Sequence, residues 1–277
     1  MNLDKSVTKK ECLVNALKQY ESLAVAFSGG VDSTFLLAVA HDVLKKKVIA
    51  LTADSPVHPP QERAHAVELA KSFGVEHIVI KSREMDNIDF VANRKNRCYV
   101  CKKLLFEDIL NLAMERGIRL VAHGANVDDL RDFRPGFKAA EEMGIVSPMV
   151  DAGLTKEDIR RLSKEMNLPT WDKPSMACLA TRIPYGTPIS LDALEMVDKA
   201  ENFITCLGFM TCRVRHHGKV ARIELSHRDF NKIMNEEIRD NVILALRKIG
   251  FSHIAVDMEG YIQGSMNRSE NCDLLRG

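Results

Sequence analysis

Short apolar runs alternate with longer amphipathic segments through the first half of the sequence. The apolar runs are typical of buried strands and lie at residues 23–27, 48–52, 78–80 and 120–122. Apolar residues at helical spacing lie at residues 34–44, 61–73 and 104–114. Thr155, followed three residues later by Asp158, predicts a capping box that opens a further helix. Strand–helix alternation of this kind predicts an α/β fold, a doubly wound sheet of parallel strands.

The pattern changes after Pro184. The segment 184–188, Pro-Tyr-Gly-Thr-Pro, indicates a linker. The elements predicted after it are a helix, two strands that turn at Gly218, a second helix and a strand, at residues 191–207, 211–216, 220–225, 231–249 and 254–257. We therefore expect a larger α/β domain at residues 1–184 and a smaller α+β domain at residues 185–277.

Charge and hydropathy exclude several classes of protein. The chain has 277 residues, with 39 Lys and Arg against 38 Asp and Glu, so it lacks the basic excess of a large nucleic-acid surface. No apolar stretch approaches the ~20 residues that a membrane helix needs. The first five residues carry no signal-peptide core. We expect a cytoplasmic protein with no membrane or nucleic-acid partner, whose seven cysteines are not paired in disulfides.

The segment 28–33 reads Ser-Gly-Gly-Val-Asp-Ser and lies between the first predicted strand and its helix. Two glycines let the backbone approach a ligand closely, and the N–H groups of a helix N-terminus favour an anion. The serines add hydroxyl donors, and Asp32 could orient the loop or hold Mg²⁺. The segment is neither a Walker A loop nor a G-x-G-x-x-G motif. The candidate phosphate-binding residues are Ser28, Gly29, Gly30, Asp32 and Ser33.

Further candidates follow the second and fourth predicted strands. Asp54 and Gly124 come at the carboxyl ends of these strands, which is where doubly wound sheets bind ligands. Asn126, Asp128 and Asp129 come directly after Gly124. We expect all five residues to lie near the bound nucleotide.

Three cysteines form a second constellation. Cys98 and Cys101 make a C-x-x-C pair, and Cys178 lies far downstream in a polar stretch. Two thiolates at this spacing commonly bind a metal or an iron–sulfur cluster, and three would suit a [4Fe–4S] cluster with one iron open for chemistry. A redox pair or two buried thiols are the alternatives for the C-x-x-C. The remaining cysteines are interpreted as small apolar or surface residues: Cys12, Cys206, Cys212 and Cys272.

The loop at residues 28–33 is the signature of the PP-loop ATP pyrophosphatases. From residue 17 to about residue 265 the chain also resembles the LarE family, the ATP-dependent sacrificial sulfur transferases. The matching stretches lie at residues 27–33, 97–102, 124–129, 132–136, 147–148, 151–156, 168–174, 177–179 and 213–215. The resemblance implies a PP-loop ATP pyrophosphatase domain followed by a smaller domain for substrate binding and oligomerisation.

The resemblance implies a role in making the nickel-pincer nucleotide cofactor. Family members use ATP to adenylate a carboxylate of pyridinium-3,5-biscarboxylic acid mononucleotide, release pyrophosphate, and convert the carboxylate to a thiocarboxylate. In one branch a single cysteine, matching Cys178, attacks the acyl-adenylate and loses its own sulfur, which leaves dehydroalanine. In the other branch three cysteines, matching Cys98, Cys101 and Cys178, hold a [4Fe–4S] cluster that donates a bound sulfide. All three are present here, which favours the cluster branch.

The predicted smaller domain adds candidate substrate ligands. Arg213 and Arg215 alternate along a predicted strand, so both point to one face, and their guanidinium groups suit the substrate phosphate. The resemblance suggests that Glu201 and Glu224 hold a divalent cation and implies a homohexamer. The cofactors expected are therefore ATP, Mg²⁺ and a [4Fe–4S] cluster.

Three rival functions share part of this pattern. A tRNA thiolase also combines a PP-loop with a C-x-x-C and a distant cysteine, and also adenylates an oxygen before adding sulfur. It needs an RNA-binding surface, which the near-neutral charge does not favour. An amidating synthetase would not need three cysteines, and an ATP-binding regulatory module would not release pyrophosphate.

Overall fold

The chain divides into two compact units. The computed structural model describes residues 2–131, 135–174 and 178–262. The first unit comprises Met1–Phe90 and Lys95–Met176, and the second comprises Val91–Arg94 and Ala177–Gly277. The domain boundary that the sequence predicted, between residues 184 and 185, lies later in the chain than the division between Met176 and Ala177.

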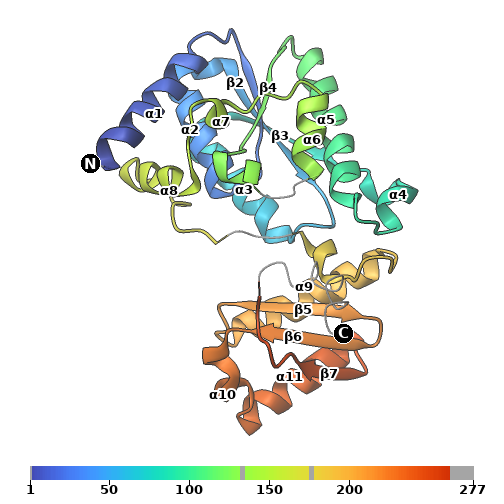
Figure 1. Cartoon of the computed structure of the whole chain (residues 1–277). Helices are drawn as coiled ribbons and strands as arrows, with labels where there is room; N and C mark the ends of the chain where they lie inside the picture. Colours follow the sequence, from blue (N-terminus) through green and yellow to red (C-terminus); the bar gives the residue numbers. More distant parts are fainter. Residues whose placement is uncertain (1, 132–134, 175–177, 263–277) are drawn as a thin grey trace, which may run out of the picture. The chain divides into compact units, whose positions relative to one another are not determined.

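The first unit is built on a parallel sheet of four strands (Figure 1). The strands are β1 (Leu23–Ala26), β2 (Val48–Asp54), β3 (Glu76–Lys81) and β4 (Val121–His123). Their order is β3-β2-β1-β4, and each neighbouring pair is parallel. The fold class predicted from the strand–helix alternation is therefore confirmed.

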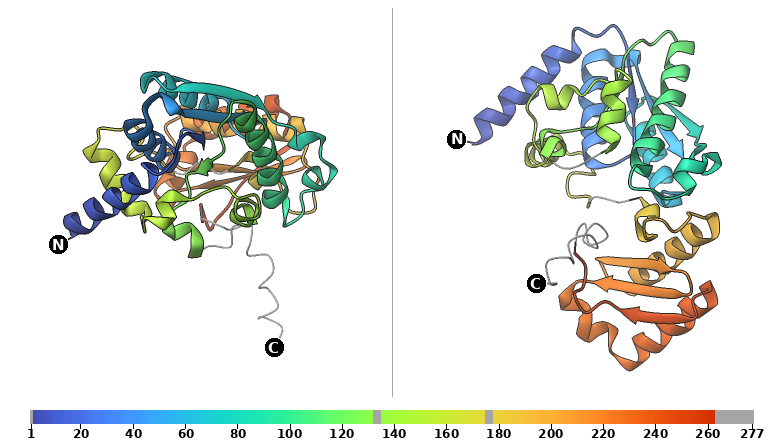
Figure 2. Two further views of the ribbon diagram at one scale, coloured as in Figure 1. Left: turned by 90° about the horizontal axis from the view of Figure 1, so that it is seen from above. Right: turned by 45° about the vertical axis from the view of Figure 1, so that its right-hand side comes forward.

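Helices cover both faces of this sheet. They are α1 (Asn2–Leu17), α2 (Val31–Leu44), α3 (Pro60–Ser72), α4 (Ile88–Val91), α5 (Arg97–Glu115), α6 (Pro135–Glu142), α7 (Pro148–Asp151) and α8 (Lys156–Glu165). Short 3₁₀ turns are η1 (Lys45–Lys47), η2 (Glu84–Asp86) and η3 (Val127–Arg131). Successive residues of β1 serve opposite faces: Val25 packs in the core with α1, α2 and α8, whereas Ala24 packs with Phe106 of α5. Figure 2 shows the ribbon of the chain in two further views.

Local patterns predicted some of these boundaries well and others poorly. The capping box is confirmed, because the Asp158 amide donates to Thr155 Oγ1 at 3.2 Å and the Thr155 amide donates to the Asp158 carboxylate at 3.2 Å. The helix expected at residues 104–114 instead begins at Arg97 and includes the C-x-x-C pair. Helix α1 was not predicted, because its first half is mainly polar and its buried anchors, Leu13 and Leu17, come late.

The second unit holds a three-stranded mixed sheet. Its elements are η4 (Leu179–Arg182), α9 (Leu191–Cys206), β5 (Cys212–His217), β6 (Val220–Leu225), η5 (His227–Asp229), α10 (Phe230–Ile233), α11 (Glu236–Ile249) and β7 (His253–Val256). Strands β5 and β6 are antiparallel, β6 and β7 are parallel, and α9 and α11 contribute to the core beside the sheet. The expected smaller α+β domain is confirmed.

One predicted helix of the second unit is two helices. The segment 231–249 breaks at Asn235, whose side chain caps α11 by accepting a hydrogen bond from the Ile238 amide at 3.3 Å. Asparagine competes for the backbone in this way, so it starts a helix more readily than it continues one. Within the described residues, every helix is too short or too polar to cross a bilayer.

Candidate functional site

The predicted phosphate loop connects β1 to α2. Gly29 has a φ of 68°, a left-handed conformation that glycine adopts without strain. A Cβ at Gly29 would also stand 3.1 Å from Ala66 Cα of α3. The loop therefore needs glycine here for its own conformation and for its packing on α3.

The two serines at the ends of the loop hydrogen-bond to each other. Their hydroxyl groups lie 3.1 Å apart, and the Ser28 amide donates to Ser33 Oγ at 3.3 Å. Helix α2 begins directly after Gly30, and no side chain caps its N-terminus. Free N–H groups and the positive end of the helix dipole therefore remain available at the loop, which is the arrangement that binds phosphate groups.

Gly124 brings the end of β4 against this loop. A Cβ at Gly124 would stand 2.8 Å from the Ser33 amide nitrogen and 3.0 Å from Ser33 Cα. These are backbone atoms in the first turn of α2, and they cannot move aside as the end of a flexible side chain could. The structure thus brings together two sequence-predicted parts of the site through direct backbone packing.

Asp32 is the ionisable residue of the loop. Its carboxylate pairs with the Lys156 ammonium of α8 and accepts a hydrogen bond from Asn126 Nδ2 at 3.4 Å. Burial raises the pKa of the Asp32 carboxyl and the Asp129 charge adds to this, whereas the Lys156 ammonium opposes it. Asp32, Asn126 and Asp129 therefore gather on one side of the loop.

The segment after β4 is tied to the start of α8. The Asn126 amide donates to the Asp129 carboxylate at 3.0 Å, and the Asp128 amide donates to Asn126 Oδ1 at 2.9 Å. The Lys156 amide donates to the Asp128 carboxylate at 2.8 Å. These bonds give the acidic segment a defined position, which a carboxylate needs if it is to help hold a metal ion.

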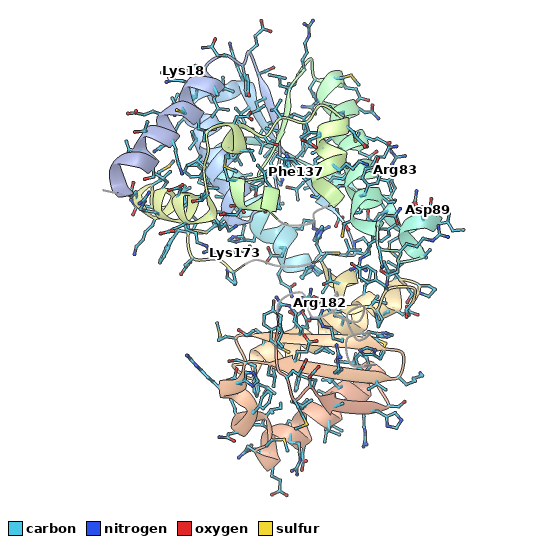
Figure 3. All side chains as sticks on the ribbon, in the orientation of Figure 1. Lys18, Arg83, Asp89, Phe137, Lys173 and Arg182 are labelled. Carbon is cyan, nitrogen blue, oxygen red and sulfur yellow. The ribbon has the colours of Figure 1, made fainter. Side chains whose placement is uncertain are left out.

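Two lysines at the loop were not assigned a role from the sequence. Lys156 pairs with Asp32. Lys173, labelled in Figure 3, donates to the Gly29 carbonyl at 3.3 Å and to the Glu62 carboxylate of α3 at 2.7 Å. Both lie in stretches that matched the family motifs, but no local pattern marks a lysine that reaches a distant loop. Their ammonium groups add positive charge where phosphates would bind.

Asp54 has a more peripheral place. It ends β2 and pairs with Arg63 of α3 at 2.6 Å, and both side chains are 45% exposed. An ion pair this exposed contributes little to stability, so Asp54 remains accessible at the carboxyl edge of the sheet.

The three candidate ligand cysteines are divided between the units. Cys98 is exposed and Cys101 is half-buried, and they lie one turn apart at the start of α5 in the first unit. Cys178 is half-buried and directly precedes η4 in the second unit. None of the three forms a disulfide, and no group of three or more metal-binding side chains gathers among the described residues. Their assembly around a cluster stays a prediction.

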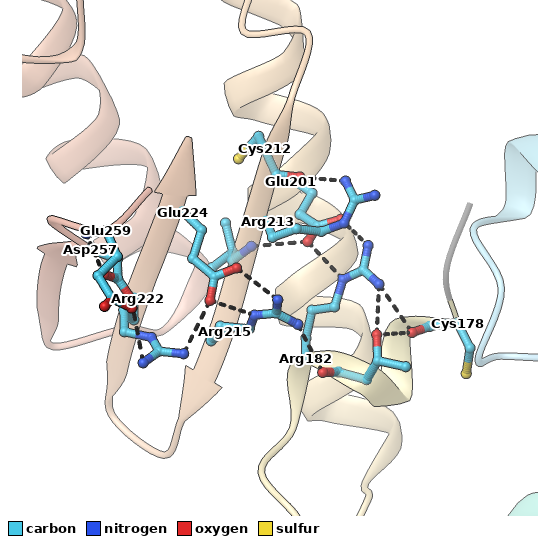
Figure 4. A network of polar contacts seen from close by, with 12 residues as sticks. Cys178, Arg182, Glu201, Cys212, Arg213, Arg215, Arg222, Glu224, Asp257 and Glu259 are labelled. Atoms are coloured by element: carbon cyan, nitrogen blue, oxygen red, sulfur yellow. Dashed lines mark hydrogen bonds and ion pairs between the residues drawn. The ribbon is translucent and has the colours of Figure 1, made fainter. Parts of the chain in front are cut away.

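The two strand arginines differ in their surroundings. They lie on the face of β5 opposite Val214, which is in the core. Arg215 is 5% exposed, and its Nε and Nη2 donate to the two oxygens of Glu224 at 2.9 and 2.7 Å (Figure 4). Arg213 is half-buried, with its guanidinium carbon 5.1 Å from the ring centre of Tyr261. Arg213 is therefore the more accessible of the two for a phosphate.

The two glutamates suggested as cation ligands are engaged by arginines. Glu201 accepts hydrogen bonds from Arg182 at 2.9 and 3.0 Å. Glu224 pairs with Arg215 and also with Arg222 at 3.1 Å. A divalent cation would have to displace guanidinium groups from both carboxylates, so this arrangement does not fit one.

Some motif residues lie outside the described residues. These are residues 132–134, which belong to the Asp-Phe-Arg-Pro-Gly stretch, and residues 175–177, which precede Cys178. Cys272, in the C-terminal tail, also lies outside them.

Some known proteins match only part of this chain, whereas others match nearly its whole length. The sequence model of the asparagine synthase family matches residues 10–99, which include the phosphate loop. An argininosuccinate synthase from Haloarcula marismortui is 29% identical over 53% of this chain and 38% of its own. An uncharacterised protein from Synechocystis sp. is 38% identical over 94% of this chain and 97% of its own. The pyridinium-3,5-bisthiocarboxylic acid mononucleotide synthase of Lactiplantibacillus plantarum is 35% identical over 94% of both chains.

Proposed function

The chain belongs to the LarE family, that of the pyridinium-3,5-bisthiocarboxylic acid mononucleotide synthase, and we propose from this premise that it makes thiocarboxylates for the nickel-pincer nucleotide cofactor. It is an ATP-dependent sulfur transferase that acts on a small-molecule nucleotide. The observation that carries the proposal is the extent of the match, which covers 94% of both chains rather than the phosphate loop alone.

The first step is adenylation at the phosphate loop. A carboxylate oxygen of the pyridinium substrate attacks the α-phosphorus of ATP, the bond between the α- and β-phosphates breaks, and pyrophosphate leaves with its electron pair. The α2 N-terminus and the Ser28 and Ser33 hydroxyls bind the phosphates, and the ammonium groups of Lys156 and Lys173 balance their charge. Asp32 and Asp129 supply the carboxylate oxygens that Mg²⁺ prefers.

The second step brings sulfur to the activated carbon, and AMP leaves. We propose that Cys98, Cys101 and Cys178 hold a [4Fe–4S] cluster. The proposal is supported by three exposed or half-buried cysteines that form no disulfide and by the placement of two of them one helical turn apart. When bound, the cluster supplies a sulfide that stays anionic at neutral pH.

The alternative sulfur source is Cys178 itself. Its thiolate would attack the acyl-adenylate to form a thioester and expel AMP. Removal of the Cα proton and cleavage of the Cβ–S bond would then release the thiocarboxylate and leave dehydroalanine. This route needs no oxidant and assigns no role to Cys98 and Cys101.

Further elements of the proposal concern binding and assembly. Arg213 binds the substrate phosphate, supported by its place on the polar face of β5. A homo-oligomer, a hexamer by family resemblance, is proposed for the assembly. A cytoplasmic location is proposed because the described cysteines form no disulfides, as expected in a reducing compartment.

The test is made on enzyme purified without oxygen. Wild type should contain about four irons per chain with matching acid-labile sulfide, and Cys178→Ala should lose them. Cys206→Ala, which removes an exposed cysteine of the same unit, should keep both and serves as the matched control.

Incubation with ATP and the pyridinium substrate should release pyrophosphate and form a thiocarboxylate. Absence of pyrophosphate release from wild type would contradict the proposed function. An iron-free but active wild type, which loses the mass of hydrogen sulfide at Cys178, would replace the cluster with the alternative sulfur source.

A further inference from the structure

The backbone carbonyl of Cys178 is held by three donors. The Thr181 amide donates to it at 3.0 Å and the Thr181 hydroxyl at 2.7 Å. Arg182 Nη1 donates to it at 3.1 Å (Figure 4). A carbonyl oxygen has two lone pairs, so three donors leave this group little freedom to turn. The backbone at the proposed sulfur-bearing residue is therefore clamped from the side of η4.

Arg182 connects this clamp to helix α9 and strand β5. Its side chain is 1% exposed, and its Nε and Nη2 donate to the two oxygens of Glu201 on α9 at 2.9 and 3.0 Å. Glu201 Oε1 also accepts a hydrogen bond from the Val214 amide of β5 at 2.9 Å. The Arg182–Glu201 pair thus links the Cys178 carbonyl to helix α9 and strand β5.

A second arginine supports the same turn. Nη1 of Arg215 donates to the Thr181 carbonyl at 3.0 Å, while the rest of its guanidinium holds Glu224. Two buried arginines, each paired bidentately with a glutamate, therefore converge on η4, a turn of four residues.

Stability alone is a weak reason for this arrangement. Burying a guanidinium and a carboxylate carries a desolvation penalty that their attraction often only offsets, and apolar residues of similar volume serve as well or better. The bidentate arginine–glutamate pair instead fixes how its two residues are placed, because two parallel hydrogen bonds set direction as well as distance. A reacting sulfur has a use for such geometry, because a misplacement of about 1 Å can cost about 100-fold in rate.

We propose that Arg182 and Glu201 are positioning residues for the sulfur-transfer step. They act through the Cys178 backbone and fix the position from which its side chain extends, and neither touches the reacting atoms. The inference rests on the proposed function, in which Cys178 carries the sulfur or ligates the cluster that does.

The test compares two half-reactions in the same preparations. Pyrophosphate release reports adenylation at the phosphate loop of the first unit, and thiocarboxylate formation reports sulfur transfer. In Arg182→Met, thiocarboxylate formation should fall about 100-fold with pyrophosphate release unchanged. Glu201→Gln, which is milder, should lower the same half-reaction in the same direction. Arg182→Lys keeps the positive charge but not the planar guanidinium that pairs bidentately with Glu201. Its thiocarboxylate formation should therefore lie between that of Arg182→Met and that of wild type.

Lys232→Met is the matched control. Lys232 also donates to a backbone carbonyl of the second unit, that of Gly208 at 3.0 Å, but on α10 rather than η4. Both half-reactions should be unchanged in this variant.

Hydrogen exchange gives a readout that does not need the loaded enzyme. The Thr181 amide, which donates to the Cys178 carbonyl, should exchange about tenfold faster in Arg182→Met, while amides of α11 keep their protection. Unchanged Thr181 exchange would overturn the clamp. An equal fall of both half-reactions would show a merely structural role, and loss of neither would also overturn the inference. If the wild type releases no pyrophosphate, the proposed function is refuted. The inference, which rests on that function, is then refuted as well.

Discussion

Replacing Gly124 with alanine should damage the fold and the phosphate loop together. The new Cβ would stand 2.8 Å from the Ser33 amide nitrogen. Non-bonded atoms prefer about 3.5–4.0 Å, so the end of β4 or the first turn of α2 must move by about 0.5–1 Å. Overpacking of this kind costs about 1–3 kcal/mol. For a unit of this size the melting temperature should fall by about 3–10 °C.

The same movement should weaken ATP binding. It shifts an N–H group of the uncapped α2 N-terminus away from the phosphates. One charge-assisted hydrogen bond is worth about 1.5 kcal/mol or more, so ATP affinity should fall about tenfold. Isothermal titration with ATP in the absence of substrate measures this, and differential scanning calorimetry measures the melting temperature.

Gly136→Ala is the matched control. Its Cβ would approach Lys102 Cγ equally closely, at 2.8 Å, but that side-chain atom moves when Lys102 changes its χ1 rotamer, whereas the Ser33 atoms near Gly124 are backbone. Its melting temperature and ATP affinity should stay near wild type. A Gly124→Ala variant that matches wild type in both measurements would refute the packing argument.

Three further predictions concern other parts of the first unit. Burial and the Lys102 ammonium lower the pKa of His123 to about 4 from 6.5, so its contribution to stability is present above pH 6.5 and lost as pH falls toward 4. Urea unfolding between pH 7.5 and 4.5 should show wild type losing about 2.5 kcal/mol more than His123→Gln, and equal losses would contradict it. Thr155→Ala removes the capping box and should cost about 1 kcal/mol of unfolding free energy, a loss that Thr155→Ser should largely avoid. Asp32→Asn should lower pyrophosphate release about 100-fold, and a rate near wild type would remove Asp32 from the adenylation site.

The architecture of the first unit was readable from local patterns. Buried parallel strands are short continuous apolar runs, and their helices show apolar residues at helical spacing. Both signals arise from neighbours in the chain, so the strand–helix order and the place of residues 28–33 followed without tertiary information. The boundaries were less readable where polar residues lie inside helices, as in α1 and in the first two turns of α5.

The site was only partly readable. The loop residues and the acidic segment 126–129 were expected together, because parallel strands end at one edge of a sheet. Lys156 and Lys173 were not expected at the loop, although both reach it through long side chains from later segments. A lysine has no sequence signature for such a role, since its partner is chosen by folding rather than by spacing.

The sequence by itself determined the α/β class, the phosphate loop and the identity of the candidate thiols, because each depends on residue type at short, regular spacing. Only the tertiary structure decided which charges are free and which are paired. Arg213 and Arg215 look alike on an alternating strand, yet Arg215 is buried on Glu224 and Arg213 is not. Pairing of this kind depends on which surfaces meet when the chain folds, and burial then makes it obligatory, because an unpaired charge in the interior is too costly.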